Sequence, residues 1–262
     1  MRRRHVLAWV GAAAAGAVLA WRPLARRQSR PWTDASVNGM RYKVLAPETT
    51  AGTRYPVLLY LHQLDMGDYP EALVRQVDVW FNTDTFQSRH PCIVVMPLLD
   101  QTHDPHGRTA NFGGKREGGA GENGAIAALR QVLAAYPVDT DRVYVTGNSM
   151  GGMGAWAMLL SYNRLTGDKA RLFAAGIPVS GADRTADPAV AAQRLWDVPI
   201  WAFHGARDPE VSPDWDRQMA RLLSGRPTFR YTEYPALRHD AWDSTYTRPD
   251  VWDWLFAQGG GA

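Results

Sequence analysis

The chain of 262 residues contains a serine, an aspartate and a histidine whose types and order could support acyl transfer. The letters GNSMG at 147–151 fit the pattern G-x-S-x-G, in which a serine stands on a sharp turn between a strand and a helix. A serine hydroxyl is a poor nucleophile unless a neighbouring base accepts its proton. Ser149 is therefore the candidate nucleophile, and it requires a base from elsewhere in the chain.

The residues on both sides of Ser149 fit the strand and the helix that this pattern requires. Residues 142–146 (RVYVT) are typical of a buried strand, and residues 152–158 (GMGAWAM) are typical of a helix that packs closely on a sheet. Such a turn lifts the hydroxyl clear of the sheet and points the helix N-terminus at a developing anion. The alternative is an ordinary glycine-rich turn in which the serine only caps the helix.

The candidate base and the acid that orients it follow later strands. His239 comes after the last expected strand and before the last expected helix, and Asp208 lies four residues beyond the end of the preceding strand. The chain order Ser149, Asp208, His239 is the order found in doubly wound hydrolases. Open parallel sheets build their sites at the carboxyl edge, where all three residues are expected to lie.

Three other aspartates compete with Asp208 for the orienting role. Asp240 adjoins His239, and neighbours in sequence rarely face each other productively, so a solvated loop or helix cap is favoured for it. Asp243 is a second competitor on the same segment. Asp183 could serve only in a variant that takes its acid from an earlier strand.

Acyl transfer also needs two donors that point at the developing oxyanion. One is expected from the backbone N–H of Met150, directly after the nucleophile. The other is expected from the loop after the strand that ends at residue 61, and so from the N–H of Gln63 or Leu64. His62 precedes these donors, and we expect it to brace the loop through hydrogen bonds, because the position of the base is already filled.

The elements that must position these residues alternate between strands and helices. The expected strands cover 41–45, 57–61, 93–96, 143–146, 174–179, 200–204 and 229–234, and the expected helices cover 123–135, 149–160, 213–224 and 249–258. The central strands are continuous apolar runs, which is typical of strands covered on both faces. The fold class is therefore α/β, with a mainly parallel, doubly wound sheet and helices on both faces.

One glycine-rich segment, 97–122, interrupts this alternation. Long stretches without periodicity inside a compact domain often line a binding site. Asn111 and Phe112 on this segment are candidate substrate contacts, and Trp242, three residues past His239, is a candidate wall of the site. The alternative is that the segment is a flexible surface insertion. Most other tryptophans, including Trp156 and Trp201, are expected in the core.

Composition excludes several classes of protein and of site. Cys92 is the only cysteine, which rules out an internal disulfide and a cysteine-based zinc site. His103, Asp104 and His106 match no closed set of metal ligands, so we expect no metal and no cofactor. The formal charge is +3, but residues 1–30 hold seven arginines and no acid, and without them the charge is −4. No nucleic-acid partner is expected from the globular part.

The first 36 residues have the layout of an export signal and a linker. Residues 1–4 are basic, and residues 6–20 are an apolar run of 15 residues that ends in small side chains. The letters RRHVL at 3–7 resemble a twin-arginine signal. We expect a signal over 1–20, an Arg/Pro-rich linker over 21–36, and one domain over 37–262. The localisation would be periplasmic or extracellular, without a membrane partner after cleavage, and an uncleaved anchor is the alternative.

Several spaced segments together resemble a known family. They are PVLLYLH at 56–62, GNSMGG at 147–152, FHGARD at 203–208, YTEYP at 231–235 and HDAW at 239–242. In this order they resemble α/β-hydrolases of the carboxylesterase, feruloyl-esterase and "predicted peptidase" group, which is related to polyhydroxybutyrate depolymerases and dienelactone hydrolases. The resemblance runs from about residue 40 to residue 258 and implies a serine esterase with Ser149, Asp208 and His239 as its triad.

Two positions depart from that family's pattern. Gln63 stands where family members usually have glycine after the strand-end histidine, and Asn148 stands where the residue before the serine is often apolar. The expected activity is hydrolysis of short-chain or aryl esters, including feruloyl and acetyl esters, as small molecules or linked to a polymer. One alternative is a serine peptidase or acyltransferase with the same triad. The other is a non-catalytic binding protein on a hydrolase fold, and Gln63 is the only residue that favours it.

Overall fold

The structure is a computed structural model that describes residues 30–64, 66–99, 111–113, 119–163, 171–183 and 186–259. The expected export signal and the linker up to residue 29 lie outside these residues, as do His103, Asp104 and His106. Among the described residues, no helix has the length and apolar character needed to span a bilayer.

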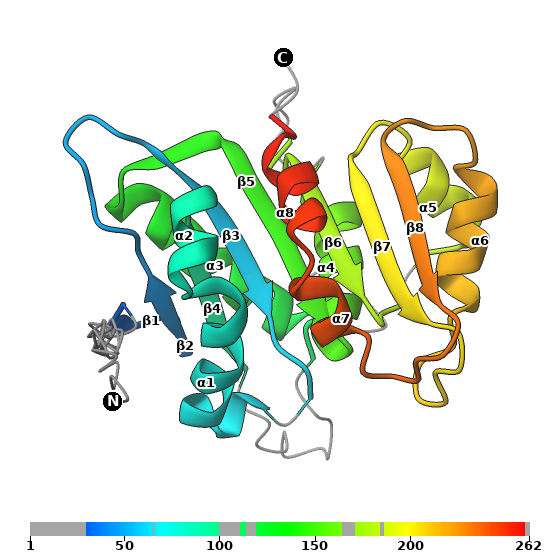
Figure 1. Cartoon of the computed structure of the whole chain (residues 1–262), viewed down its shortest axis with the longest axis horizontal. Coiled ribbons are helices and arrows are strands. Elements are labelled where there is room, and N and C mark those ends of the chain that lie inside the picture. Colours follow the sequence, from blue (N-terminus) through cyan, green and yellow to red (C-terminus); the bar gives the residue numbers. More distant parts are fainter. Residues whose placement is uncertain are drawn as a thin grey trace, which may run out of the picture.

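Within the described residues, an eight-stranded sheet forms the centre of the molecule (Figure 1), in the order β1-β2-β4-β3-β5-β6-β7-β8. Strands β3 to β8 run parallel, whereas β2 pairs antiparallel with both β1 and β4. The strands are β1 Trp32–Val37, β2 Met40–Leu45, β3 Tyr55–Leu61, β4 Ile93–Leu98, β5 Val138–Asn148, β6 Ala175–Val179, β7 Ile200–Gly205 and β8 Phe229–Tyr234. The expected mainly parallel sheet is confirmed.

Helices cover both faces of this sheet (Figure 1), and each face has its own hydrophobic core. The core on one face involves α3, α4, α5 and α6, and the core on the other involves α1, α2, α7 and α8. The helices are α1 Pro70–Phe81, α2 Asp84–Arg89, α3 Ala120–Ala135, α4 Met150–Ser161, α5 Pro188–Arg194, α6 Asp214–Leu222, α7 Trp242–Tyr246 and α8 Pro249–Phe256, with a 3₁₀ turn η1 at Met66–Asp68.

Strand β3 shows why the central strands are apolar throughout. Val57, Leu59 and Leu61 belong to the core under α3 and α4, whereas Leu58 and Tyr60 belong to the opposite core. Side chains alternate between the two faces of a strand, so a strand covered on both faces needs an apolar residue at every position. Such a strand is held firmly, and its carboxyl end can present the loop of His62 and Gln63 in a fixed place.

The structure corrects the expected linker and contains elements that are not predicted from the sequence. Strand β1 occupies residues 32–37, where we expect the end of the linker, and Trp32 Nε1 donates to Asp78 Oδ1 of α1 at 2.8 Å. This strand is polar and half exposed, so it lacks the apolar run that predicts a central strand. Helices α1, α2, α5 and α7 are also additional, and three of them have seven residues or fewer.

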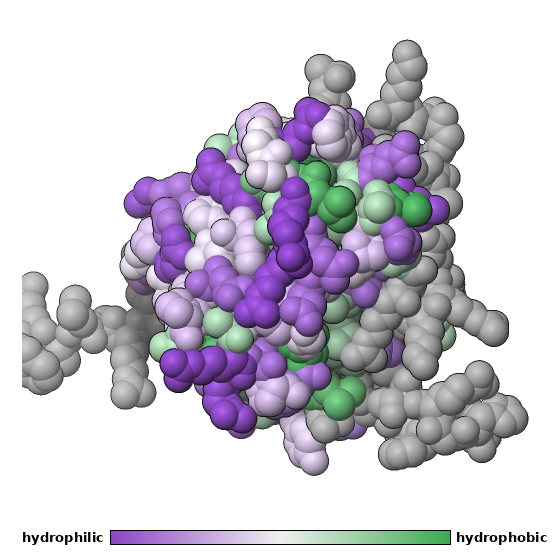
Figure 2. Space-filling model, turned by 90° about the vertical axis from the view of Figure 1, so that its right-hand side faces the viewer, coloured by the Kyte–Doolittle hydropathy of each residue, from purple (hydrophilic) through white to green (hydrophobic). Residues whose placement is uncertain are grey.

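The tryptophans expected in the core lie there. Trp156 and Trp252 are almost completely buried, and Trp201 and Trp254 are 8% exposed. The surface at the β8 edge of the sheet, by contrast, is mostly hydrophilic, with small, separate apolar spots (Figure 2). Charged side chains on β8, such as Arg230 and Glu233, help to keep this edge strand from pairing with another chain.

Candidate active site

Ser149 stands on a strained turn between β5 and α4. Its φ and ψ angles are 55° and −118°, a region that non-glycine residues seldom adopt. The glycines two residues before and after it are required by the close approach of backbones: a Cβ on Gly147 would lie 2.4 Å from the Gly151 carbonyl oxygen, and a Cβ on Gly151 would lie 1.8 Å from that of Leu61. The expected turn therefore forms, and the alternative of a relaxed helix cap does not fit this backbone.

The structure brings the three predicted side chains into one hydrogen-bonded line. His239 Nε2 lies 2.7 Å from Ser149 Oγ, and His239 Nδ1 lies 2.7 Å from Asp208 Oδ2. With the proton on Nδ1, the imidazole donates to the carboxylate and leaves Nε2 to accept the hydroxyl proton. This arrangement can convert the hydroxyl of Ser149 into a nucleophile.

Two neighbouring loops hold His239 against Asp208. The loop after β7 donates from Ala206 N to the Tyr234 carbonyl at 3.0 Å and from Arg207 N to the Leu237 carbonyl at 3.1 Å. At the end of β7, a Cβ on Gly205 would lie 1.8 Å from the carbonyl oxygen of Arg238, so glycine is required where the loops meet. The carboxyl edge of β7 and β8 thereby becomes a rigid frame for the acid and the base.

Asp208 remains ionised in spite of its burial. Its Oδ1 accepts hydrogen bonds from the backbone N–H groups of Glu210 and Val211, at 2.9 and 3.0 Å. Burial opposes ionisation, but the hydrogen bonds from His239, Val211 and Glu210 outweigh it and hold the pKa of Asp208 below its usual range. An ionised carboxylate is the form that can stabilise a protonated imidazole.

The competing aspartates lie elsewhere. Asp183 Oδ2 accepts a hydrogen bond from Ala186 N at 2.8 Å, so it fixes its own loop. Asp243 Oδ1 accepts from Trp80 Nε1 at 3.0 Å, and Asp240 is exposed on the surface. Of these acids, only Asp208 is within hydrogen-bonding distance of the Nδ1 atom of His239.

The two expected oxyanion donors belong to segments that touch. A Cβ on Gly151 would meet the carbonyl groups of both Leu61 and His62, which places the start of α4 directly against the loop of Gln63. Met150 is the first residue of α4 and is almost fully buried, and Gln63 is half exposed. The Gln63 side chain is held in place, because its Oε1 accepts from Asn148 Nδ2 and its Nε2 donates to Gln76 Oε1, both at 3.0 Å.

His62 braces this loop, as expected. Its Nδ1 lies 2.7 Å from the Gln63 carbonyl oxygen, and its Nε2 accepts the backbone N–H of Leu99 at 3.1 Å. One ring nitrogen therefore donates and the other accepts, which is the pattern of a neutral imidazole. Burial lowers the pKa of His62 to about 4, in agreement with that pattern.

Trp242 and Glu210 flank the exposed side of the base. The ring of Trp242 packs edge to face on the His239 ring with a centroid distance of 5.5 Å. A carboxylate oxygen of Glu210 lies 3.7 Å from His239 Nε2, and the Glu210 side chain is 68% exposed. These residues line an open surface hollow of about 300 Å³ together with Pro209, Arg238 and Asp240.

The two candidates on the segment 97–122 have different surroundings. Phe112 is completely buried, and its ring packs edge to face on His62 at 5.1 Å. This placement corrects the expected substrate contact, because a side chain without exposed surface serves packing. Asn111 is half exposed, and its Oδ1 accepts from Gly113 N at 2.8 Å, so it shapes a local turn.

A buried pair of side chains that is not predicted from the sequence, His204 and Asp216, lies directly behind Asp208. His204 Nε2 is 3.1 Å from Asp208 Oδ2, and His204 Nδ1 is 2.7 Å from Asp216 Oδ2. Both side chains of the pair are fully buried. His204 belongs to the FHGARD segment, but nothing in the spacing of α6 distinguishes Asp216 from a surface acid.

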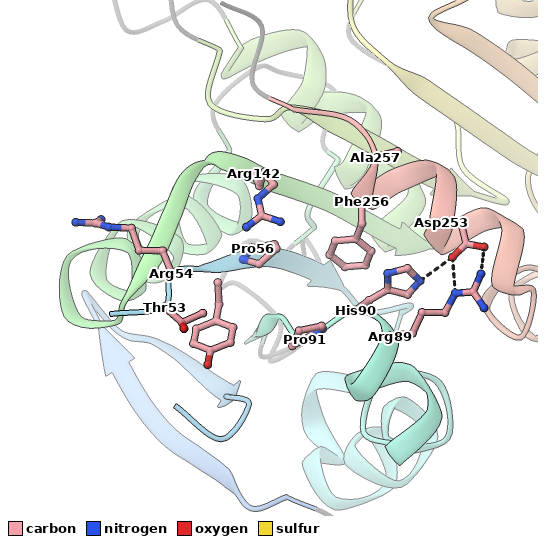
Figure 3. A pocket seen from close by; sticks show the side chains of 11 residues that line it. Thr53, Arg54, Pro56, Arg89, His90, Pro91, Arg142, Asp253, Phe256 and Ala257 are labelled. Atoms are coloured by element: carbon pink, nitrogen blue, oxygen red, sulfur yellow. Dashed lines mark hydrogen bonds and ion pairs between the residues drawn. The ribbon is translucent and has the colours of Figure 1, made fainter. Parts of the chain in front are cut away.

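The hollow drawn in Figure 3 lies at the other end of the strands. It has a volume of about 460 Å³, and Arg54 and Arg142 line it near the beginnings of β3 and β5. Both Arg89 and His90 reach Asp253 there (Figure 3), whereas Arg142 pairs with Asp139 outside the hollow. Among the residues that the structure describes, no cluster of three or more His, Cys, Asp or Glu side chains could hold a metal ion.

Comparison with solved structures places this arrangement among known folds. A thermostable esterase with 25% sequence identity superposes with a TM-score of 0.68 over 87% of this chain. A putative dienelactone hydrolase from Klebsiella pneumoniae (16% identity, TM-score 0.57) is matched over 87% of this chain and 97% of its own. The feruloyl esterase module from Clostridium thermocellum, in complex with sinapinate (15% identity, TM-score 0.61), is matched over 87% of this chain and 88% of its own. The chain has the α/β-hydrolase fold.

In sequence the relationship is distant. No family profile matches this chain. No curated protein sequence matches it either. The chain spans 63% of the length of the thermostable esterase. The fold and the geometry at Ser149, rather than overall sequence similarity, therefore carry the functional argument.

Proposed function

We propose that this α/β-hydrolase is a serine carboxylic ester hydrolase that acts through an acyl-enzyme. The observation that carries the proposal is the line from Ser149 Oγ through His239 to Asp208, with 2.7 Å at both steps. The esterases among its structural neighbours support the same reaction class. The complete hydrogen-bonded triad argues against a non-catalytic binding protein, because a binding role does not require a serine with a strained backbone and a hydrogen bond to a histidine base.

In the proposed mechanism, Ser149 Oγ attacks the ester carbonyl while His239 Nε2 takes its proton. Asp208 keeps the imidazole in the required tautomer and stabilises the imidazolium. The N–H groups of Met150 and Gln63 are assigned to the oxyanion, which forms at the N-terminus of α4, where the helix dipole favours negative charge. His239 then protonates the leaving alcohol, and the acyl group stays on Ser149. A water molecule next attacks the acyl-enzyme while His239 takes its proton, and His239 returns that proton to Ser149 Oγ as the carboxylic acid leaves.

The substrate side of the site supports small or aryl esters. Trp242 offers an aromatic edge beside the base, and Asn111 remains a candidate contact at the start of the described part of its segment. An aryl or acyl group that lies against Trp242 would be close to His239, where the alcohol leaves. We therefore propose short-chain or aryl esters, free or linked to a polymer, as substrates.

Steady-state hydrolysis of p-nitrophenyl acetate and butyrate tests the proposal. We expect the wild type to turn over these esters and Ser149→Ala, His239→Ala and Asp208→Asn each to lose about a thousandfold or more in kcat, as triad members act as a unit. Full activity in Ser149→Ala would refute the assignment. A chromogenic dipeptide that is turned over far better than any ester would favour a peptidase, and acyl transfer to added alcohols would favour an acyltransferase.

We also propose that the enzyme is exported, on the strength of residues 1–20. The basic start and the 15-residue apolar run carry this proposal. Cell fractionation of the full chain tests it, with Arg3 and Arg4 both replaced by lysine as the control for the twin-arginine route. Activity that stays in the cytoplasm in the wild type would contradict it.

A further inference from the structure

The carboxylate of Asp208 receives a second imidazole besides that of His239. Both His239 Nδ1 and His204 Nε2 approach the same oxygen, Oδ2, at 2.7 and 3.1 Å. His204 stands on β7 and is fully buried, and its other nitrogen reaches Asp216 on α6. Asp216 is in turn held by the indole N–H of Trp156 at 3.1 Å, on the helix that follows Ser149.

The atoms around His204 fix how many protons this buried pair holds. Nε2 faces two acceptors, Asp208 Oδ2 and the Val211 carbonyl oxygen at 3.0 Å, and Nδ1 faces Asp216 Oδ2. A lone pair on Nε2 would face only acceptors, so Nε2 carries a hydrogen. The short distance between Nδ1 and Oδ2 needs a second hydrogen, on either of the two atoms. The pair of His204 and Asp216 is therefore neutral overall and holds two protons.

The electrostatics of the surrounding elements agree with this count. Burial opposes a charged His204, but Asp216 outweighs it and the pKa of His204 is raised, while burial also raises the pKa of Asp216. The charged groups that face the pair are Asp208 from the β7 loop and Glu233 from β8, the strand partner of His204. Glu233 is itself paired with Arg217 of α6, at 2.8 Å, and accepts from Tyr231.

We propose that His204, held by Asp216, is a positioning residue for the acid of the triad. Its Nε2–H gives Asp208 Oδ2 a permanent second donor, so the buried carboxylate stays ionised and oriented when the proton on His239 moves during the reaction. The inference rests on the proposed function, because it assigns a role within the same triad. Asp208 Oδ1 accepts from the backbone N–H groups of Glu210 and Val211, which leaves Oδ2 for both imidazoles.

Two double variants separate the donor from simple packing. His204→Gln with Asp216→Asn keeps the hydrogen-bond network but contains no titrating group. The amide nitrogen at position 204 can donate to Asp208, and the amide oxygen at 204 can accept from the amide nitrogen at 216. The amide oxygen at 216 can still accept from Trp156. His204→Leu with Asp216→Leu fills a similar volume but removes the donor. Replacing both partners of a buried pair by apolar groups can leave stability nearly unchanged.

The readout is the rate at which a fluorophosphonate labels Ser149, measured over roughly pH 5 to 9, with urea unfolding of each variant in parallel. We expect the double leucine variant to label about tenfold or more slowly, because Asp208 is no longer held in position, with the acid limb of its profile moved to higher pH by about one unit, because a carboxylate that has lost one donor attracts the proton of its remaining partner more strongly. The Gln/Asn variant should recover most of the rate and the wild-type limb.

Several results would overturn the proposal. One is wild-type labelling and profile in the double leucine variant, and another is a folded Gln/Asn variant that labels as slowly as the leucine variant. If the leucine variant does not fold, the Gln/Asn variant decides alone, through its rate and the position of its acid limb. Proton NMR gives a readout that is independent of reactivity: the wild type should keep an exchange-protected Nε2–H signal of His204 at neutral pH, and its absence would refute the proton count.

Failure of the proposed function would be recognised separately. Labelling of Ser149 needs the triad but no particular substrate, so a wild type that labels and hydrolyses no ester would contradict the ester hydrolase and leave the role of His204 standing.

Discussion

Asn148, at the end of β5, donates a hydrogen bond from Nδ2 to Oε1 of Gln63 in the loop after β3, at 3.0 Å. These are the two positions at which the sequence departs from the family that it resembles. The bond is part of a longer chain, because Tyr60 OH donates to Asn148 Oδ1 at 2.8 Å and Gln63 Nε2 donates to Gln76 Oε1. The two departures therefore compensate each other: the residue before the nucleophile holds the loop that carries the second proposed oxyanion donor.

This bond predicts that Asn148 and Gln63 act as one unit in catalysis. We expect Asn148→Leu and Gln63→Gly each to lower kcat about tenfold, because the loop loses its anchor and the oxyanion donor its position. The double variant should lose little more than either single variant, which a double-mutant cycle on p-nitrophenyl butyrate can measure. Fully additive losses would show that the two residues act independently.

Trp242 predicts a preference for aromatic substrates. Because its ring packs edge to face on His239, Trp242→Ala should lower kcat/KM for aryl esters about three- to tenfold more than for small alkyl esters. Trp242→Phe should keep most of the preference. Trp196→Ala is the matched control, since Trp196 is 45% exposed and lies before the amino end of β7. An equal loss for aryl and alkyl esters would assign Trp242 to the support of His239 alone.

Glu210 predicts discrimination against negatively charged esters. Its carboxylate lies 3.7 Å from His239 Nε2 at the rim of the site, and like charges repel, so we expect it to disfavour an anionic substrate. We expect Glu210→Gln to raise kcat/KM for a hemisuccinate ester about three- to tenfold relative to a neutral ester, and added salt to reduce the difference by screening. Glu48→Gln, an exposed acid between β2 and β3, is the control. Unchanged selectivity in Glu210→Gln would contradict this role.

His62 predicts a loss of stability in mild acid. The folded chain holds the pKa of His62 at about 4, below its ordinary 6.5, so the unfolded chain binds the proton more readily. The stabilisation is complete above pH 6.5 and is lost as the pH falls toward 4, by up to about 3 kcal/mol from this group. Urea unfolding of the wild type and His62→Asn over this range isolates the contribution. Their difference in unfolding free energy should shrink as the pH falls, and a constant difference would contradict the account.

The sequence predicts the parts of the fold that are buried on both sides. The central strands and the helices after Ser149 and Pro249 are predicted to within a few residues, because apolar periodicity reports burial directly, although β5 begins at Val138, five residues before its expected start. Strand β8 is predicted at Phe229–Tyr234 although it is a half-exposed edge strand. The sequence predicts a linker over most of strand β1, because a polar edge strand lacks an apolar periodicity. Helix α1 is predictable in principle, because Pro70 stands at its first turn and Leu73, Val77 and Trp80 are buried at helical spacing.

The candidate site divides in the same way. Chain order and the carboxyl edge of a parallel sheet suffice to group Ser149, Asp208 and His239, because topology alone brings strand ends together. The roles of Phe112 and Asp216 depend on which face of a segment turns inward, and single residues on short or irregular segments do not reveal that. Phe112 is buried against His62, and Asp216 is buried behind Asp208, contrary to the ordinary expectations for a loop aromatic and a helix acid.

The most direct test of the central claim is to trap and locate the acyl group. Rapid mixing of the wild type with p-nitrophenyl butyrate should release a burst of about one nitrophenolate per molecule, and acid quenching followed by peptide mass mapping should find the butyryl group on Ser149. Ser149→Ala should show neither the burst nor the modified peptide. Turnover without acylation at Ser149, or acylation at another residue, would contradict the proposal that this α/β-hydrolase is a serine esterase.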